Sequence, residues 1–277
     1  MSAATPEGHI RLVVSDIDGT LVRHDKSLSD ANIAAAARLR TAGIGLALIS
    51  ARPRSGMAWI VDALGIDGVC GAFNGGTLFD RRGDIGTPER MDQAVSQRLL
   101  AMIDAAGADA WVFTRGLWYA RNDDNPHDAR ERLSSGLAPT LQADLAAAIR
   151  AGGGADKVVG VSDDAALLQR LEAEVRDAVG DGATVALSQP YFLDATARLA
   201  NKGDGVAALA KAMGVPLEQV AVIGDMPNDL PMFARAGLAI AMGQAPEAVR
   251  ARAHWTTASN EDDGVARAID RLIGARP

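Results

Sequence analysis

Three carboxylates, a hydroxyl and an ammonium group in this sequence have the types and spacing that suit phosphate chemistry. Asp16 and Asp18 stand two residues apart, and Asp225 supplies a third carboxylate in a separate turn. Carboxylates without positive partners repel one another, and Mg2+ relieves such crowding because it accepts one or two carboxylates together with water and phosphate oxygens. Ser50 and Lys202 add hydrogen-bond donors for an anion. These residue types predict a site that holds a phosphate ester beside a magnesium ion.

The elements that must position these residues alternate between predicted strands and helices. Short apolar runs that are typical of buried parallel strands end at the polar turns: Ile10–Ser15, Ile44–Ile49 and Gln219–Ile223. Ser29 is a predicted helix N-cap between the first two runs. Further predicted elements are strands at Val69–Phe73 and Leu238–Ala241 and a helix at Gly264–Ile273. Because ligands bind at the carboxyl ends of strands in an open α/β sheet, we expect the polar turns to converge.

The middle of the chain has a different pattern. Its predicted strands are more irregular and are separated by helical stretches: Trp111–Arg115, Trp118–Ala120, Lys157–Val161 and Thr184–Ser188. Ala151–Gly154 is predicted to be a flexible connection. We therefore expect an α/β fold, a doubly wound Rossmann-like parallel-sheet core from residues 1–82 and 196–277, with an inserted α+β cap domain at 83–195.

Composition and charge exclude several classes of protein. The 277 residues are 48% hydrophobic and 23% charged, a balance typical of a folded globular chain. The formal charge of −7 argues against a nucleic-acid or anionic-membrane partner. Residues 83–195 hold 10 basic and 18 acidic side chains, so the acidity belongs to the predicted cap. Cys70 is the single cysteine, no apolar run reaches membrane-spanning length and Met1–Gly8 lacks a signal pattern, so we expect a cytoplasmic location.

Four segments resemble, in order, the four motifs of the haloacid dehalogenase superfamily. They are Asp16–Leu21, Ser50–Arg52, Lys202–Gly203 and Gly224–Asp229. More narrowly, the chain resembles the Cof-type phosphatases, which carry a large cap inserted between the second and third motifs. Three further segments also resemble that subfamily: Asn74–Gly76, Ala241–Gln244 and Ser259–Gly264.

The resemblance implies a Mg2+-dependent phosphatase that hydrolyses a small phosphorylated metabolite, such as a sugar phosphate, through an aspartyl-phosphate. It implies that Asp16 is the nucleophile and that Asp18 is the general acid/base. The implied metal ligands are the carboxylates of Asp16 and Asp225 and the backbone carbonyl of Asp18. The implied phosphate-binding groups are Ser50, Lys202, Asn228 and the backbone N–H groups of Ile17 and Ala51. Asp229 is implied to support Asp225 or Lys202.

Several points stay open on the sequence alone. Ala51 stands where the family usually has glycine, and its Cβ narrows the available backbone conformations. We expect neighbouring carboxylates to raise the pKa of Asp18, opposed by the metal, so that it can protonate a leaving alcohol. Arg52 could meet the substrate or pair with the cap, and Asn74 could serve the site or only hold a turn. One basic residue of the stretch 115–132 could meet the leaving group.

Other functions share these motifs. The alternatives are a phosphomutase or a glycosyl-phosphoglycerate phosphatase with the same core, and a non-catalytic protein that binds a phosphorylated metabolite. The physiological substrate, the cap residues that set specificity and the oligomeric state are not predicted.

Overall fold

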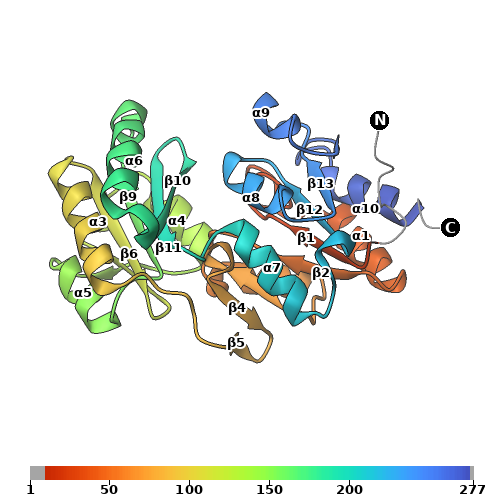
Figure 1. Cartoon of the computed structure of the whole chain (residues 1–277), viewed down its shortest axis with the longest axis horizontal. Helices are drawn as coiled ribbons and strands as arrows, with labels where there is room; N and C mark the ends of the chain where they lie inside the picture. Colours follow the sequence, from red (N-terminus) through yellow and green to blue (C-terminus); the bar gives the residue numbers. More distant parts are fainter. Residues whose placement is uncertain (1–9, 275–277) are drawn as a thin grey trace.

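The computed structural model describes residues 10–274, so the predicted absence of a signal in Met1–Gly8 concerns residues outside the described part. The chain forms two lobes side by side (Figure 1). The right-hand lobe is built from the first and last parts of the described chain, and the left-hand lobe is built from its middle. Among residues 10–274, no helix combines the length and apolar character needed to cross a membrane.

A parallel sheet forms the centre of the right-hand lobe, as predicted. Its five strands lie in the order β14-β13-β12-β1-β2, and every pair is parallel. The strands are β1 (Leu12–Ser15), β2 (Gly45–Leu48), β12 (Val220–Gly224), β13 (Leu238–Ala241) and β14 (Trp255–Thr256). The internal strand β1, which lies between β12 and β2, is fully buried because helices cover both faces of the sheet.

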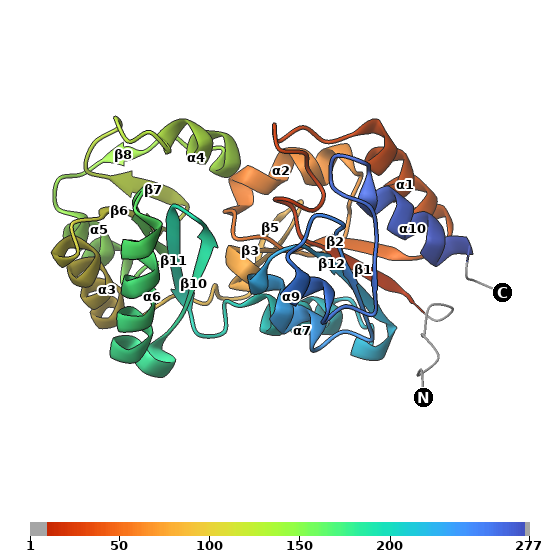
Figure 2. The ribbon, with the colours of Figure 1, turned by 90° about the horizontal axis from the view of Figure 1, so that it is seen from above.

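The alternation of side chains along β1 divides the core of this lobe in two. Val13 packs with apolar residues of α1 (Asp30–Thr41), α2 (Arg54–Ala63) and α10 (Gly264–Gly274). Leu12 and Val14 point to the opposite face and pack with α7 (Lys202–Ala212), α8 (Leu230–Phe233) and α9 (Glu247–Arg250). Figure 2 shows the two groups of helices on opposite sides of the sheet. This is the doubly wound arrangement that the alternating pattern predicted.

The first helix begins where its sequence predicts. The side chain of Ser29 accepts a hydrogen bond from the backbone N–H of Asn32 and so caps α1. The helix stops before Gly43, which adopts a left-handed φ of 70° that is easiest for glycine. This helix carries the chain from β1 back to β2.

The predicted strand at Val69–Phe73 is shorter and pairs differently from the prediction. Strand β3 (Cys70–Ala72) touches the end of β2 through a single bridge between Ile49 and Gly71. Its regular partner is an antiparallel strand, β4 (Thr77–Asp80), which in turn pairs with β5 (Gly83–Ile85). The chain turns back through the tight 3-10 turn η2 (Phe73–Gly75) instead of entering a helix, and this produces a hairpin instead of another βα unit.

A second, six-stranded sheet lies in the left-hand lobe, in the order β10-β11-β9-β6-β7-β8. Its strands are β6 (Asp109–Thr114), β7 (Leu117–Ala120), β8 (Thr140–Leu141), β9 (Lys157–Val161), β10 (Ala183–Gln189) and β11 (Phe192–Ala197). The helices of this lobe are α3 (Gln93–Ala105), α4 (Asp128–Ser135), α5 (Leu145–Gly152) and α6 (Ala165–Val179). The remaining elements are three short 3-10 turns: η3 (Gly180–Gly182), η4 (Leu217–Gln219) and η5 (Pro227–Asp229).

The two faces of this second sheet meet different surroundings. Val112 and Val158 pack with the apolar faces of α3, α5 and α6. Trp111 and Phe113 point the other way, into a cluster that continues into the right-hand lobe. Phe113 meets Phe73 edge to face, with 6.2 Å between the ring centroids. The buried aromatic residues of β6 and β7 are therefore part of the apolar core.

The lobes also touch through α2 and α4. Ser55 donates a hydrogen bond of 2.6 Å to the carbonyl of Ser135. A Cβ added at Gly56 would lie 2.0 Å from the carbonyl oxygen of Ser134, so the close approach of the helices requires glycine there. We call the left-hand lobe the cap; its predicted boundaries, residues 83–195, stay a prediction.

The glycine tract at Ala151–Gly154 is the end of a helix and a packed turn. Gly152 closes α5, and Gly153 follows in a left-handed conformation. A Cβ at Gly154 would lie 2.0 Å from the carbonyl oxygen of Met91. The tract was predicted as a flexible connection; the structure places it in close contact with the segment that enters α3.

Candidate active site

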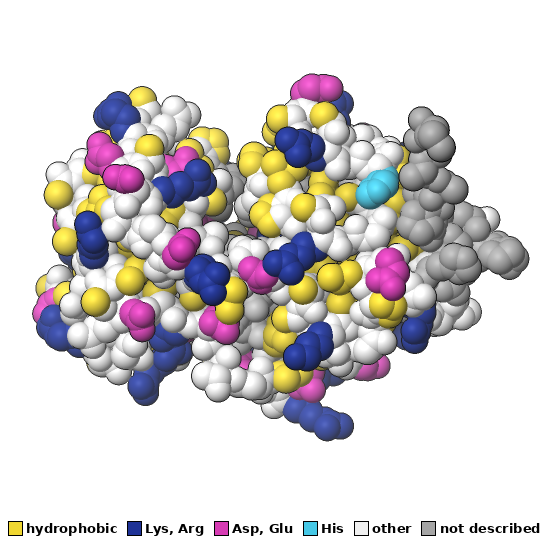
Figure 3. Space-filling view, viewed as in Figure 1, with side chains coloured by type: hydrophobic (Ala, Val, Ile, Leu, Met, Phe, Trp, Pro, Cys, Tyr) yellow, Lys and Arg dark blue, Asp and Glu magenta, His cyan; other side chains and the backbone are white. Residues whose placement is uncertain are grey.

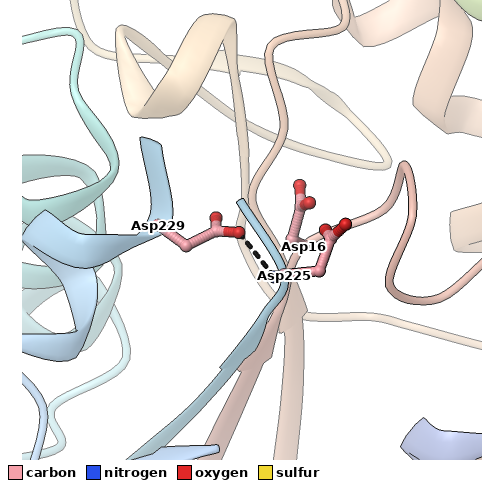
Figure 4. A group of neighbouring side chains, drawn as sticks. All are labelled: Asp16, Asp225 and Asp229. Carbon is pink, nitrogen blue, oxygen red and sulfur yellow. Dashed lines mark hydrogen bonds between the residues drawn. The ribbon is translucent and has the colours of Figure 1, made fainter. Parts of the chain in front are cut away.

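The predicted polar turns converge at the carboxyl end of the parallel sheet. Asp16 follows β1, Ser50 follows β2 and Asp225 follows β12. Figure 4 shows Asp16 and Asp225 at the ends of adjacent strands, with Asp229 on the neighbouring turn. One oxygen from each of these three carboxylates lies within 4.8 Å of the others. The parallel order of the strands thus brings distant acidic residues into one buried cluster.

Lys202 is the cation at the centre of this cluster. Its ammonium lies 2.7 Å from an oxygen of Asp16 and 2.6 Å from Oδ1 of Asp229. The side chain is only 2% exposed. Burial alone would lower the pKa of Lys202, but the negative charges of Asp16 and Asp229 raise it above its ordinary value. Lys202 is therefore held positively charged where it faces Asp16.

Asp229 is fully engaged by protein donors. Its Oδ1 accepts from Lys202, and its Oδ2 accepts from the backbone N–H groups of Asp225 and Met226, at 2.8 and 2.9 Å. A Cβ at Gly224 would lie 2.5 Å from the Asp229 side chain, so only glycine leaves room for it. Asp229 thus fixes both Lys202 and the turn that carries Asp225.

Asp225 has a narrower set of partners. The hydroxyl of Thr20 donates to its Oδ1 at 2.9 Å. Burial, followed by the charge of Asp229, raises the pKa of Asp225 to about 7. Burial also raises the pKa of Asp16 well above its ordinary value, against the attraction of Lys202. One ammonium therefore does not neutralise the cluster.

This donor set fits a divalent cation. The cluster has surplus negative charge, hard oxygen donors and raised carboxylate pKa values, which a cation of the Mg2+ type would relieve. Glycine at position 19 leaves the space beside the Asp225 carboxylate unfilled, because a Cβ there would lie 2.4 Å from Oδ2 of Asp225. Both oxygens of Asp229 already accept hydrogen bonds, so Asp16 and Asp225 are the carboxylates that can still coordinate a cation.

Asp18 lies in a positive environment, and the prediction that its pKa is raised is wrong. The guanidinium of Arg52 reaches both of its oxygens, at 2.7 and 2.8 Å, and Lys26 adds a contact of 2.6 Å. Burial would raise the pKa of Asp18, but Arg52 and then Lys26 lower it well below its ordinary value. The two cations come from loops whose approach to Asp18 has no local sequence signature. Arg52 thus pairs with Asp18 and not with an acidic residue of the cap.

The remaining predicted site residues have unused hydrogen-bonding groups. Ser50 is 2% exposed, and its Oγ accepts from the backbone N–H of Arg52 at 3.2 Å. The Oδ1 atom of Asn228 is buried without a partner. Among residues 10–274, the backbone N–H groups of Ile17 and Ala51 donate to no protein acceptor. Ala51 has no positive φ, so the alanine fits where the family usually has glycine.

Segments outside the four motifs hold the site in shape. Gln244 donates to the carbonyl of Gly19, and Asn260 donates to the carbonyl of Val22 at 3.0 Å, so both secure the loop after β1. Asn74 adopts a left-handed φ of 57° in η2. This turn lets Gly75 approach Gly205 in α7, where a Cβ on Gly75 would lie 2.3 Å from the Gly205 Cα. Asn74 therefore serves a turn that packs under the Lys202 helix.

A cavity between the two lobes connects this cluster with the cap. Its core side is lined by Asp16, Asp18, Ser50, Ala51, Lys202 and Asn228, together with Lys26 and Arg52. Its cap side includes Arg130, Glu131, Lys157, Tyr191 and Asp194. Sequence reasoning missed Lys26, Thr20 and the cap side apart from the stretch that contains Arg130. Figure 3 shows a hollow between the lobes and charges of both signs scattered over this face.

Comparison with known proteins agrees with this architecture. Residues 13–269 match the haloacid dehalogenase-like hydrolase family. The chain is 25% identical to phosphatase YwpJ of Bacillus subtilis, over 95% of this chain and 100% of that protein. It is 27% identical to the pyridoxal phosphate phosphatase YbhA of Escherichia coli, over 94% and 97% of the two chains.

A solved structure has the same fold along its whole length. It is that of a haloacid dehalogenase-like hydrolase from Bacteroides thetaiotaomicron, with a TM-score of 0.83 and 28% identity. The match covers 95% of this chain and 99% of that one. The family predicted from the four motifs is thereby confirmed: the chain belongs to the haloacid dehalogenase-like hydrolases, among the phosphatases of that superfamily.

Proposed function

We propose that the protein is a Mg2+-dependent phosphatase that hydrolyses small phosphorylated metabolites of the sugar-phosphate kind through a phosphorylated Asp16. The observation that carries the proposal is the contact between Asp16 and Lys202, 2.7 Å apart at the floor of the cavity. A carboxylate beside a fixed ammonium provides a nucleophile together with a charge that stabilises the phosphoryl oxygens. We further propose that the reaction takes place in the cytoplasm.

Asp16 is the proposed nucleophile. Its carboxylate oxygen attacks phosphorus, the bond from phosphorus to the leaving oxygen breaks, and the phosphoryl group stays on Asp16 as an acyl phosphate. Lys202, Ser50, Asn228 and the free N–H groups of Ile17 and Ala51 bind the phosphoryl oxygens. Asp229 acts as a positioning residue, because its hydrogen bonds keep Lys202 directed at Asp16.

Asp18 is the proposed acid and base. In the second half of the reaction, its carboxylate takes a proton from the water that attacks the phosphorylated Asp16. The Arg52 and Lys26 contacts hold Asp18 ionised, which is the form required for this step. In the first half, Asp18 donates a proton to the leaving oxygen, so substrate binding must weaken these contacts before the proton is loaded.

Asp16, Asp225 and the backbone carbonyl of Asp18 are the proposed Mg2+ ligands. When bound, the ion neutralises negative charge on the transferring phosphoryl group and on the carboxylates. The raised pKa of Asp225 supports this assignment, because the site is electrostatically incomplete without a cation.

Hydrolysis of para-nitrophenyl phosphate tests the proposal. The protein should release nitrophenol in MgCl2 and lose this activity in EDTA. Asp16→Asn should lower kcat by at least about a thousandfold, because the amide is not a nucleophile for phosphorus. Quenching the Asp18→Asn variant in acid should reveal a phosphorylated Asp16 by mass spectrometry. Undiminished turnover in Asp16→Asn would contradict the proposed mechanism.

A further inference from the structure

Three charged side chains of the cap face the catalytic cluster across the cavity. Glu131 lies on α4, Lys157 begins β9 and Asp194 lies on β11. All three line the cavity that reaches Asp16 and Lys202, yet each is at most 6% exposed. We call Glu131, Lys157 and Asp194 the cap triad.

The strand alternation shows that Lys157 and Asp194 point toward the catalytic lobe. Lys157 shares a face of β9 with Val159, and Asp194 shares a face of β11 with Phe192. Val159 and Phe192 belong to the apolar cluster that continues into the catalytic lobe. Their neighbours Val158 and Leu193 instead pack on the outer side, with α3, α5 and α6.

The hydrogen-bonding capacity of the triad is almost unused. The closest ion pair within it, from the Lys157 ammonium to Glu131 Oε1, is 3.9 Å long. Within residues 10–274, neither the Lys157 ammonium nor the Glu131 carboxylate takes part in a hydrogen bond, and the buried Oδ1 of Asp194 has no partner. Three buried charges without hydrogen bonds are costly for folding alone, and their shared cavity indicates a ligand.

Charged groups of the triad and of the catalytic lobe influence one another across the cavity they share. Burial raises the pKa of Glu131 to about 7, with Lys157 opposing this shift and Asp194 adding to it. The charge of Asp18 also raises the pKa of Glu131. Because Asp16, Asp18 and the triad line one cavity, a leaving group on a phosphate at Asp16 can extend to the triad.

We propose that Glu131, Lys157 and Asp194 form the subsite for the leaving group and select a neutral, polyhydroxylated alcohol. A hydroxyl donates to a carboxylate and accepts from an ammonium, so adjacent hydroxyls satisfy both kinds of group in the triad. Two carboxylates against one ammonium disfavour a second phosphate at this position. The inference rests on the proposed phosphatase function, because it assigns the far end of the same substrate.

The surroundings of the triad are consistent with such a ligand. The ammonium of Lys157 lies 4.5 Å from the centre of the Phe113 ring, which fixes its position without using its N–H groups. Tyr191 and Phe192 add aromatic surface to the cavity, suited to the carbon face of a sugar or polyol. Arg130 is exposed at the rim of the cavity, where it stacks over Tyr191. It therefore does not neutralise the net negative charge of the triad.

The test compares monophosphates that differ in the hydroxyls of the leaving group. The polyhydroxylated probes are glycerol 3-phosphate, ribose 5-phosphate, glucose 6-phosphate and sorbitol 6-phosphate; propyl phosphate is the probe without further hydroxyls. We expect kcat/KM for the best polyhydroxylated probe to exceed that for propyl phosphate by about tenfold or more. Asp194→Asn, Glu131→Gln and Lys157→Met should each reduce this ratio by about tenfold and leave turnover of propyl phosphate nearly unchanged.

Asp181→Asn is the matched control, since Asp181 is an exposed carboxylate of the cap; it should change neither rate. The melting temperatures of Asp194→Asn and Glu131→Gln should equal or exceed that of the wild type, because each substitution removes a poorly paired buried carboxylate charge. Lys157→Met should instead lower the melting temperature, because the buried Glu131 loses its cation. A wild-type ratio near one, or variants that slow both kinds of probe equally, would overturn the subsite. Absence of turnover of para-nitrophenyl phosphate by the wild type would instead overturn the phosphatase function itself.

Discussion

Arg52 holds the carboxylate of Asp18 at two points, through hydrogen bonds of 2.7 and 2.8 Å to its two oxygens. The same guanidinium donates to the carbonyl of Gly56 at 3.0 Å, at the helix where the cap meets the catalytic lobe. Because a planar guanidinium bound on two sides leaves little freedom, Arg52 sets both the direction and the charge of Asp18.

Replacing Arg52 by methionine should therefore affect kcat more strongly than it affects substrate binding. We expect kcat for para-nitrophenyl phosphate to fall by about tenfold to a hundredfold, because Asp18 loses its orientation. Without the guanidinium the pKa of Asp18 rises, so the acidic limb of the kcat profile should move to higher pH. Arg54→Met, an exposed neighbour in α2, is the control and should retain both rate and profile.

Magnesium should stabilise the protein more strongly at alkaline pH. The raised pKa of Asp225, about 7, means that the metal-free fold loses stability as pH rises from the unfolded value of about 4 through about 7. Mg2+ binds the ionised form, so the increase in melting temperature on adding MgCl2 should be larger at about pH 8 than at about pH 6.

Asp225→Asn should remove this dependence. The metal-free variant should be more stable than the wild type at about pH 8, and MgCl2 should no longer shift its melting temperature. Asp177→Asn, which changes an exposed carboxylate in α6, should respond to MgCl2 as the wild type does. If MgCl2 shifted the melting temperatures of the wild type and Asp225→Asn equally, Asp225 would not be a metal ligand.

Lys202→Met should be destabilising as well as inactive. The substitution leaves Asp16 and Asp229 buried without their cation, which costs about 3–5 kcal/mol of unfolding free energy. Loss of the ammonium raises the pKa of Asp16 further, so the deficit should grow with pH and shrink in acid. Urea unfolding at several pH values measures this, with the exposed Lys211→Met at the end of the same helix as control. A deficit independent of pH would show that electrostatics are not its cause.

The contact beneath α7 can be tested without touching a charged residue. In Gly205→Ala, the new Cβ would lie 2.7 Å from the carbonyl oxygen of Asn74 and 2.9 Å from the Cα of Gly75. Since backbone must move, we expect a loss of about 1–3 kcal/mol in stability and a lower kcat from the displaced Lys202. Gly274→Ala, with open space around its Cβ, should change neither stability nor rate. An unchanged kcat would show that Lys202 tolerates the shift.

The sequence predicted the parts of the fold that depend on local patterns. Apolar runs that end at a polar turn located β1, β2, β12 and β13 to within a few residues. The same rule misjudged the pairing of β3, because a hairpin and a βα unit begin with the same kind of strand. The direction of the Asp18 pKa depends on Lys26 and Arg52, which only the folded chain brings to it.

The residues of the cap triad likewise could not be predicted from the sequence. Lys157 and Asp194 lie within strands of mixed composition, and Glu131 lies on a polar helix. Nothing in their spacing distinguishes them from solvated surface charges. Their burial and missing partners emerge only when α4, β9 and β11 come together over the catalytic lobe.

The order of strands in the parallel sheet bears on how the protein is made. Strand β1 pairs with β12, and Thr20 contacts Asp225 across a separation of 205 residues. A ribosome therefore completes β1, β2 and the whole cap while the β12 side of β1 is still an unpaired strand edge, which is prone to aggregation. The acidic cluster cannot form until residues 220–229 have emerged. A chain truncated before them therefore lacks the catalytic site and has no activity.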